Sequence, residues 1–230
     1  MLCGVHFMGE TAKILSPDKK VLVPDVAAGC SLADSCKAAE FAEFIRKNPG
    51  HKVISYVNTT AEVKALTDVV VTSTNARQIV ESFPEDEKII FGPDRNLGNY
   101  INSVTGRNML LWNGACHVHE QFSVRKIEKL KEVYPDAKVL VHPECKGSVV
   151  RLADKVGSTA ALLKFAVNSD SNVFIVATES GILHEMQKQA PEKTFIPAPP
   201  EDSSCALNDC NYMKMNTLEK VYDALKGIRC

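Results

Sequence analysis

Residues 52–101 read KVISYVNTTAEVKALTDVVVTSTNARQIVESFPEDEKIIFGPDRNLGNYI, and residues 138–187 read KVLVHPECKGSVVRLADKVGSTAALLKFAVNSDSNVFIVATESGILHEMQ. The two stretches lie 86 positions apart (138 minus 52) and carry the same elements in the same order: an apolar strand, a polar turn, a helical segment, a short strand that leads into Ser-Thr, a second helix and a third apolar strand. Strands that alternate with helices of about 10–15 residues are typical of βαβ units in a parallel sheet. The repeat therefore predicts an α/β protein made of similar units.

The same offset reaches the start of the chain. Within the segment MLCGVHFMGETAKIL, the part from Cys3 onward precedes IIFGPDRNLGNYI by 86 positions (89 minus 3) and has the same strand-turn-helix form. It is predicted to be the last βα unit of an earlier repeat, whose first part would come before Met1. Since 230 residues divided by 86 is about 2.7, we expect two complete units and the closing portion of a third.

The composition excludes several classes of protein. The chain has 27 basic and 28 acidic residues, a formal net charge of −1, whereas proteins that bind nucleic acid usually carry a basic surplus. No apolar run approaches the roughly 18–20 residues that a membrane span requires, and the start lacks the basic region and cleavage site of a secretory signal. With 45% hydrophobic residues, the chain is predicted to be soluble and cytoplasmic, with no nucleic-acid or membrane partner.

Eight cysteines are many for a cytosolic chain of this length. They are Cys3, Cys30, Cys36, Cys116, Cys145, Cys205, Cys210 and Cys230. None forms a Cys-x-x-Cys pair, and a reducing cytosol disfavours disulfides. The simplest interpretation of any one of them is a small, buried apolar side chain.

The repeat singles out three of these cysteines. Cys30 follows the predicted strand VLVPD, Cys116 follows MLLWN 86 positions later, and Cys210 follows TFIPAP at the head of CNYMKMN. Equivalent loops around a common axis would bring three thiolates together, and thiolates are the preferred ligands of iron–sulfur clusters and of zinc. Three thiolates rather than four would leave one metal open to act as a Lewis acid.

Polar side chains gather where the predicted strands end, the place at which ligands collect in parallel sheets. These side chains are Tyr56, Asn58, Ser73, Ser158, Thr159, His142, Glu144, Thr178 and Glu179. Taken alone, Glu144 would more often be a solvated loop carboxylate and His142 a packed strand-end histidine. His119, three residues after Cys116, is either a partner of metal ligands or a cap of the following helix.

Several segments in one order resemble the quinolinate synthase family, the iron–sulfur enzymes of de novo NAD synthesis. They are CGVHFMGETAKIL, AGCSLADSC, YVNTTAEVKA, VVVTSTNA, FGPDRNLG, CHVHE, VLVHPEC, VGSTA and CNYMKMNTLEKV. The resemblance implies an α/β fold with a pseudo-threefold repeat of three-layer αβα domains that have parallel sheets. The implied domains are residues 1–25, an incomplete first domain completed by the C-terminal helix 210–230; residues 26–112, the second; and residues 113–209, the third.

The resemblance also implies a cofactor and a reaction. A 4Fe-4S cluster would be held by Cys30, Cys116 and Cys210, the same three cysteines that the repeat singles out. The implied transferase reaction condenses iminosuccinate with dihydroxyacetone phosphate to quinolinate, phosphate and water. A possible partner, on the same resemblance, is the aspartate-oxidising enzyme that supplies iminosuccinate.

The substrate pocket implied by the resemblance is lined by Tyr56, Asn58, Ser73, His142, Glu144 and Thr159. Two condensations and two dehydrations need a group that moves protons. We expect Glu144 to be this acid/base, His142 to be a donor or second shuttle, and Tyr56 to belong to the catalytic group. Asn58, Ser73 and Thr159, beside helix N-termini, suit phosphate and carboxylate oxygens.

One feature of the family is missing from the sequence. Relatives carry a preceding segment, of about 50 residues by the repeat arithmetic, with a His-x-Tyr motif and an Asp-Ser pair that reach the substrate. A misplaced start at Met1 or an incomplete gene product would each explain its absence. We expect the chain by itself to bind substrate poorly and its first domain to expose sheet edge and apolar surface.

Other interpretations stay open. The chain could be a non-catalytic remnant of the same fold, with structural zinc on the three cysteines or a cluster without a complete pocket, or a phosphosugar-binding dehydratase. Cys36 and Cys145 are expected to be structural, and Cys3 and Cys230 to have no function. A regulatory disulfide that involves Cys205 is a further alternative.

Overall fold

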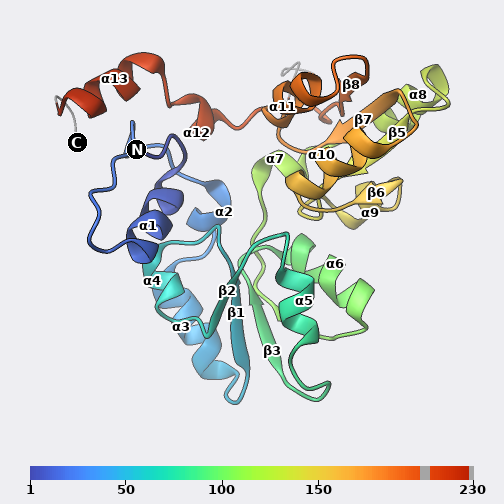
Figure 1. Cartoon of the computed structure of the whole chain (residues 1–230). Helices are drawn as coiled ribbons and strands as arrows, with labels where there is room; N and C mark the ends of the chain where they lie inside the picture. Colours follow the sequence, from blue (N-terminus) through green and yellow to red (C-terminus); the bar gives the residue numbers. More distant parts are fainter. Residues whose placement is uncertain (203–207, 228–230) are drawn as a thin grey trace.

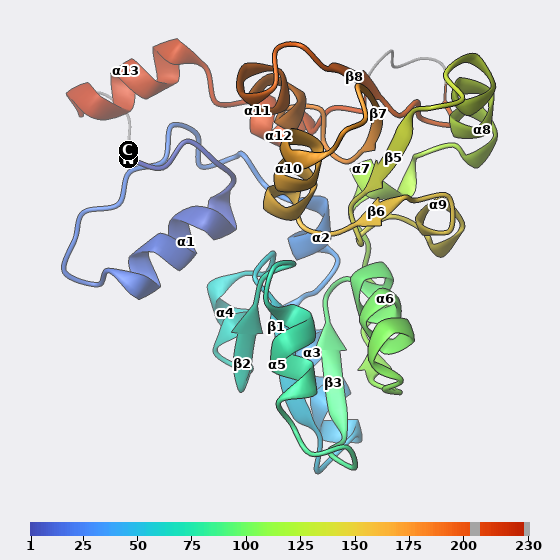
Figure 2. The same cartoon turned by 45° about the vertical axis from the view of Figure 1, so that its right-hand side comes forward.

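The computed structural model describes residues 1–202 and 208–227. Figures 1 and 2 show two separate lobes, each built on one sheet, while the two ends of the chain lie together beside them. Those ends carry α1 (His6–Leu15) and α13 (Leu218–Lys226). No helix within the described residues is both long enough and apolar enough to cross a membrane.

The first lobe is a parallel sheet with the strand order β2-β1-β3-β4. Its strands are β1 (Lys52–Tyr56), β2 (Val69–Val71), β3 (Ile89–Gly92) and β4 (Leu110–Leu111), and its helices are α3 (Ala38–Lys47), α4 (Ala61–Lys64), α5 (Ala76–Glu81) and α6 (Arg95–Thr105). Successive side chains of a strand point to opposite faces. Val53 of β1 therefore packs with Phe41 of α3, whereas Ile54 packs with Val80 of α5 and Leu97 of α6. Helices cover both faces of this sheet, which makes three layers.

The second lobe repeats this arrangement, with the strand order β6-β5-β7-β8. Its strands are β5 (Lys138–Val141), β6 (Lys155–Val156), β7 (Val173–Ala177) and β8 (Thr194–Pro197), and its helices are α8 (Val124–Val133), α9 (Gly147–Val150), α10 (Thr159–Asn168) and α11 (Ile182–Gln189). Val139 of β5 packs with Ile127 of α8, and Leu140 packs with Leu162 of α10 and Met186 of α11. The second sheet also lies between two layers of helices.

The 86-residue offset holds for individual contacts of the two lobes. Ile54 pairs with Val69 between β1 and β2, and Leu140 pairs with Lys155 between β5 and β6, each 86 positions later. The carboxylate of Asp68 accepts the Val53 N–H at 2.7 Å. The carboxylate of Asp154 accepts the Val139 N–H at 2.8 Å in the same way. The predicted similarity of these two units is confirmed at the level of register and hydrogen bonding.

The prediction of a strand at residues 21–25 is wrong. This segment and residues 1–5 have no regular strand structure, although the Leu2 N–H donates to the Leu22 carbonyl at 2.9 Å. A strand needs a neighbour that pairs with it over several residues, and this single hydrogen bond does not provide one. The predicted exposed sheet edge is therefore not found within the described part of residues 1–25.

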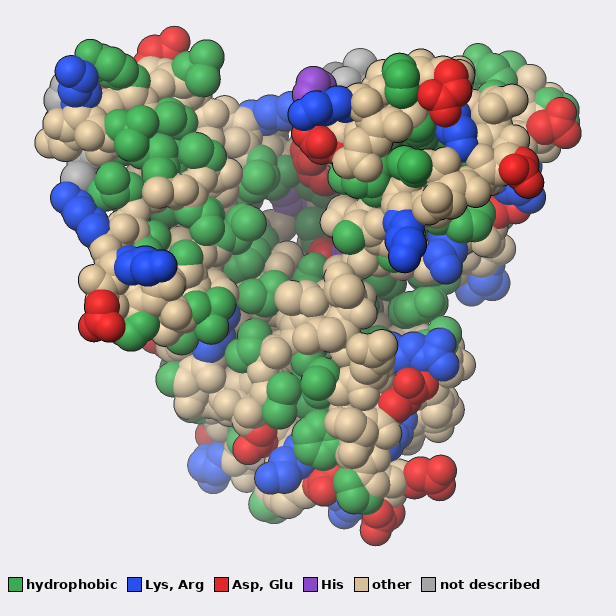
Figure 3. Space-filling model, viewed as in Figure 1, with side chains coloured by type: hydrophobic (Ala, Val, Ile, Leu, Met, Phe, Trp, Pro, Cys, Tyr) green, Lys and Arg blue, Asp and Glu red, His purple; other side chains and the backbone are tan. Residues whose placement is uncertain are grey.

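The predicted exposed apolar surface is confirmed. Figure 3 shows apolar side chains gathered over the side of the molecule formed by α1 and α13. The large exposed apolar residues there include Ile14, Leu15, Val26, Leu218, Tyr222 and Leu225. Leu15 and Leu218 have 78% and 84% of their surface in contact with solvent, values typical of a helix face that is not packed against anything.

Candidate metal and acid–base site

Three short helices each begin directly after a cysteine. Cys30 is the N-cap of α2 (Ser31–Asp34), Cys116 that of α7 (His117–Glu120), and Cys210 that of α12 (Asn211–Lys214). The N–H groups of a first helical turn have no partner inside the helix, so they point toward the capping residue. At Cys30 and Cys116, backbone N–H groups of the following helix favour a negative charge on sulfur.

Burial opposes the ionisation of these thiols. Burial is the largest effect on Cys30 and raises the pKa of its thiol to about 11, against hydrogen bonds from the Ala33 and Leu32 N–H groups that lower it. Burial, together with the charge of Glu144, also raises the pKa of the Cys116 thiol. Without a cation both groups are neutral thiols, whereas a coordinated metal would deprotonate them.

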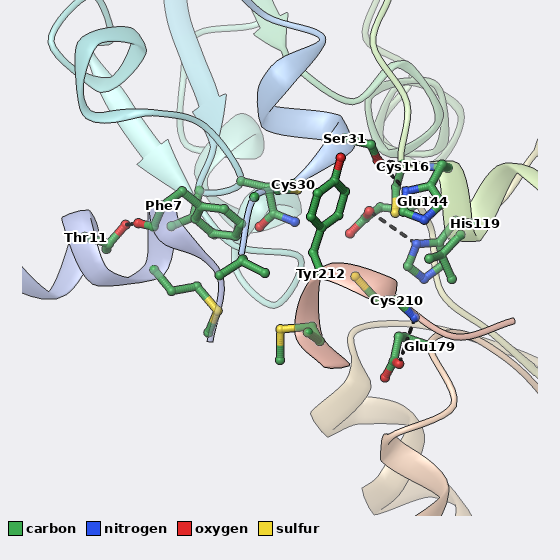
Figure 4. Close-up of a pocket in the computed structure, with 18 of the residues that line it drawn as sticks. Phe7, Thr11, Cys30, Ser31, Cys116, His119, Glu144, Glu179, Cys210 and Tyr212 are labelled. Atoms are coloured by element: carbon green, nitrogen blue, oxygen red, sulfur yellow. Dashed lines mark hydrogen bonds and ion pairs between the residues drawn. The ribbon is translucent and has the colours of Figure 1, made fainter. Parts of the chain in front are cut away.

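The three cysteines line one cavity of about 510 Å³. Figure 4 shows Cys30, Cys116 and Cys210 around this space, and Figure 3 shows a hollow between the side formed by α1 and α13 and the second lobe. The Cys210 N–H donates to Glu179 Oε1 at 3.2 Å, which ties its loop to the end of β7. The thiol of Cys30 interacts electrostatically with both Cys116 and Cys210.

The carboxylate of Glu144 lies at the centre of the polar groups beside the cysteines. The Tyr56 hydroxyl, from the end of β1, donates to Glu144 Oε1 at 2.7 Å. His142 Nδ1 lies 3.5 Å from the same oxygen, and His119 Nδ1 lies 3.4 Å from Oε2. The rings of His119 and His142 are 4.9 Å apart. Side chains that are distant in the sequence, from both lobes and α7, therefore surround one carboxylate.

Burial and neighbouring charges shift the pKa values of these groups in different directions. Burial would raise the pKa of Glu144, but the nearby His119, with smaller effects of His142 and Tyr56, outweighs it and holds the pKa at about 2. Burial lowers the pKa of His142 to about 4, and burial, with the charge of Glu144, raises the pKa of Tyr56. Near neutral pH the site contains a carboxylate, a neutral imidazole at His142 and a neutral phenol.

The remaining predicted pocket residues lie at different depths. Asn58, in the loop after β1, lines the cavity directly. Ser73 lowers the pKa of the Tyr56 phenol, against the larger effects of burial and Glu144. Thr159 is exposed at the first position of α10, next to the N-cap Ser158. Within residues 1–202 and 208–227, the lining of the cavity includes neither Ser73 nor Thr159.

Two further residues contact the site, and sequence reasoning assigned them no role. Asn96 Nδ2 donates to the Glu144 carbonyl at 3.0 Å and so joins α6 to the loop that carries this carboxylate. Asp94 is fully buried, caps α6 through the Leu97 N–H at 2.7 Å, and interacts electrostatically with Glu144. Both residues follow the end of β3 closely, within the segment FGPDRNLG. The rule that ligands collect at strand ends could therefore have found them.

The other cysteines have different surroundings. Cys36 and Cys145 are buried, and the Cys145 thiol donates to the Ala177 carbonyl at 3.4 Å, while Cys3 is exposed. The expectation that Cys36 and Cys145 are structural stays a prediction. Cys205 and Cys230 lie outside the described residues, and so does any disulfide of Cys205.

The donors around the cavity fit a metal centre. Cys116 Sγ, a ring nitrogen of His119 and a carboxylate oxygen of Glu144 lie within 4.8 Å of one another. In the described part of the chain, His119 Nδ1 is buried and has no hydrogen-bond partner. Unbridged sulfur atoms and an unpartnered imidazole nitrogen around one cavity are the donor types that iron and zinc take.

The fold and the site define an α/β protein with a cysteine-lined centre near the carboxyl ends of the strands of two parallel sheets. Residues 1–229 match the family model described as Quinolinate synthetase A protein. The chain belongs to this family.

Curated relatives agree with the family model. The chain is 58% identical over 222 residues to the quinolinate synthase of Thermosynechococcus vestitus, a match that covers 96% of the chain and 70% of the relative. It is 55% identical over 229 residues to that of a Synechococcus species, with 100% of the chain and 72% of the relative covered. The quinolinate synthase of a Synechocystis species is 56% identical over 226 residues, with 98% and 71% covered.

Proposed function

We propose that this chain carries out the reaction after which its relatives are named, the formation of quinolinate. The substrates would be iminosuccinate and dihydroxyacetone phosphate, and the other products phosphate and water. The observation that carries the proposal is the meeting of three helix-capping cysteines with the carboxylate of Glu144 at one cavity. The transferase class of the reaction belongs to the same proposal.

The cysteines would hold a 4Fe-4S cluster. Cys30, Cys116 and Cys210 supply three thiolates, and the N–H groups of the helices that they cap stabilise negative charge on sulfur. When bound, the cluster would supply one iron without a protein thiolate, a Lewis acid for a substrate oxygen or nitrogen.

Glu144 would move the protons. Its Oε1 already accepts from the Tyr56 hydroxyl, so Oε2, which faces His119 Nδ1 at 3.4 Å, would take a proton from substrate and return it when water leaves. The low pKa of Glu144 keeps this oxygen deprotonated near neutral pH, which makes it available to accept a proton but only weakly basic in the metal-free site. His142, neutral there, accepts the Glu144 N–H at Nδ1 at 3.4 Å and would pass on a proton as a second shuttle.

The amide and hydroxyl groups would bind the polar ends of the substrates. Asn58 at the cavity wall suits a carboxylate or phosphate oxygen. Ser73 would orient the phenol of Tyr56, whose pKa it influences. Thr159 is exposed at the start of α10 and does not line the cavity. It would contact substrate only if another segment of protein closed over this surface.

We also infer the arrangement of the whole family fold for this chain. Residues 26–112 and 113–209 would be two domains of a pseudo-threefold set, and residues 1–25 with 210–230 would belong to the first. The exposed apolar faces of α1 and α13 support this division, because such faces are normally packed inside a domain. A cytoplasmic location and a partnership with an aspartate-oxidising enzyme that supplies iminosuccinate are part of the same proposal.

Anaerobic reconstitution with iron and sulfide tests the proposal. We expect visible iron–sulfur absorption and about four irons per chain, both lost in Cys116→Ala and retained in Cys3→Ala, a matched change of an exposed cysteine. Zinc uptake without iron–sulfur absorption would favour a structural zinc site instead.

Product formation then separates an enzyme from a cluster-binding remnant. The loaded chain is mixed with freshly generated iminosuccinate and dihydroxyacetone phosphate, and quinolinate is measured by chromatography. Quinolinate above the level of the Glu144→Gln variant supports the proposed reaction. A chain with a full complement of iron and no product would be a non-catalytic member of the family.

A further inference from the structure

Cys116, His119 and Glu144 form a donor group distinct from the three cysteines. Their ligand atoms lie within 4.8 Å of one another. Cys116 and His119 stand three positions apart at the start of α7, a spacing that places both side chains on one face of a helix. Glu144 comes from the loop after β5, and only 3% of its surface is exposed.

The hydrogen bonds of His119 leave one ring nitrogen facing the carboxylate. His119 Nε2 lies 3.1 Å from Thr178 Oγ1, and Nδ1 lies 3.4 Å from Glu144 Oε2 without a hydrogen bond in the described part of the chain. When Nε2 donates to the threonine hydroxyl, Nδ1 carries a lone pair. A lone pair and a carboxylate oxygen repel each other in a buried place unless a proton on the ring or a metal cation lies between them.

The neighbours of this group resemble the outer shell of a metal site. Thr178 fixes the ring of His119, and the Tyr56 hydroxyl fixes Glu144 Oε1 at 2.7 Å. Partners of this kind orient the ligands of zinc sites and select the histidine tautomer. Cys116, His119 and Glu144 all line the cavity of about 510 Å³, which gives an ion a path inward and leaves a fourth position open.

We propose that the metal-free chain binds one Zn²⁺ through Cys116 Sγ, His119 Nδ1 and a carboxylate oxygen of Glu144, with the fourth position facing the cavity. Sulfur, imidazole nitrogen and carboxylate oxygen are all zinc ligands, and three protein ligands with an open position are typical of non-structural zinc sites. As the zinc–sulfur bond forms, the Cys116 thiol releases its proton to solvent. No redox step is involved.

This zinc site goes beyond the proposed enzyme reaction and competes with it. Cys116 belongs both to this group and to the proposed cluster ligands, so one sulfur cannot serve both at once. Zinc bound first would therefore block cluster assembly. The competition also distinguishes this proposal from structural zinc on Cys30, Cys116 and Cys210, because only one of the two sites uses His119.

The test measures Zn²⁺ binding to the anaerobic, chelator-treated full-length chain by competition with a chromophoric chelator. Cobalt serves as a second probe, because a thiolate–cobalt absorption reports on the sulfur ligand. The variants are His119→Ala, matched with His117→Ala, and Cys116→Ser, matched with Cys30→Ser. His117 and Cys30 line the same cavity and lie outside the proposed zinc ligands.

We expect one zinc per wild-type chain and a loss of affinity of at least about 100-fold in His119→Ala and Cys116→Ser, since loss even of an outer-shell partner costs roughly 10–100-fold. His117→Ala and Cys30→Ser should keep wild-type zinc affinity, although Cys30→Ser should lose the cluster. Zinc lost in Cys30→Ser and kept in His119→Ala would overturn the proposal, as would a wild-type chain that binds no zinc. Cluster assembly is measured on separate samples, so the failure of either proposal is recognised independently.

Discussion

The Ser31 hydroxyl and the Nδ1 atom of His117 lie 2.7 Å apart, although 86 positions separate these residues in the sequence. The same hydroxyl also accepts the His117 N–H at 3.2 Å. Each residue directly follows one of the cysteines singled out by the repeat, so the contact joins the first turns of α2 and α7. It fixes the position of Cys30 relative to Cys116 through the backbone of both loops.

Replacement of Ser31 by alanine should loosen this connection. We expect Ser31→Ala to lower the free energy of unfolding by about 1 kcal/mol, the usual value for one hydrogen bond. In reconstituted protein it should speed the loss of iron–sulfur absorption in air, because two proposed ligand loops would move more freely. Ser103→Ala, at an exposed position of α6, is the control; equal rates of bleaching in both variants would contradict the positioning role.

Gly114 should tolerate no side chain. A Cβ atom at this position would lie 2.5 Å from the Pro93 carbonyl oxygen and would also clash with Ser35 Oγ. Because the Gly114 N–H also donates to that carbonyl, any shift is passed to Cys116 two residues later. We expect Gly114→Ala to cost about 1–3 kcal/mol in urea unfolding and to lower the iron content after reconstitution.

Gly147, at the first position of α9, is the matched control for Gly114. Its nearest neighbour to a new Cβ would be Arg151 Nη1 at 3.7 Å, an ordinary contact. Gly147→Ala should leave stability unchanged or raise it by up to about 1 kcal/mol, because alanine favours a helix over glycine. Similar destabilisation in both variants would show that the close approach at Gly114 is unimportant.

The hydroxyl of Tyr56 should stabilise the folded chain through the buried charge of Glu144. Tyr56→Phe removes the donor at Oε1 and leaves the carboxylate less compensated, so we expect a loss of roughly 2–3 kcal/mol, as for hydrogen bonds to charged groups. Guanidinium unfolding measures this loss. The exposed Tyr134 supplies the control Tyr134→Phe, and an equally small effect of both changes would argue against an ionised Glu144.

Much of the two lobes could be predicted from sequence, because each strand is a short apolar run followed by a polar turn. The hydrogen bond from the Val53 N–H to the Asp68 carboxylate recurs 86 positions later, from the Val139 N–H to the Asp154 carboxylate. Residues 21–25 were mispredicted for the same reason. Their apolar pattern resembles a strand, but a strand also requires a paired neighbour, which a local pattern does not reveal.

The site was only partly predictable. Spacing alone brought Cys30 and Cys116 into one group, and the strand-end rule found Glu144. The contact of Glu144 with His119 depends on how α7 crosses between the lobes, which no local pattern encodes. Asn96 was missed because its amide acts through a backbone carbonyl rather than through a recognisable motif.

The stability of the metal-free chain should fall as the pH drops through the titration range of His142. Burial lowers the pKa of His142 from 6.5 to about 4, so between these values the unfolded chain binds a proton that the folded chain does not. The free energy of unfolding therefore rises with pH across this window, by roughly 3 kcal/mol in total, and is fully gained above about pH 6.5. Glu144, whose pKa is lowered from 4.5 to about 2, adds stability that is lost only as the pH falls below 4.5.

Denaturant unfolding in the presence of a chelator, between pH 4.5 and 6.5, measures the contribution of His142 by comparison with a variant, since the lowered pKa of His117 contributes to the same slope. His142→Gln should flatten the slope of unfolding free energy against pH, because glutamine takes up no proton in either state. His184→Gln changes an exposed histidine and should keep the wild-type slope. If His142→Gln and the wild-type chain gave parallel curves, His142 would be protonated equally in the folded and unfolded states, and its burial as a neutral ring beside Glu144 would be refuted.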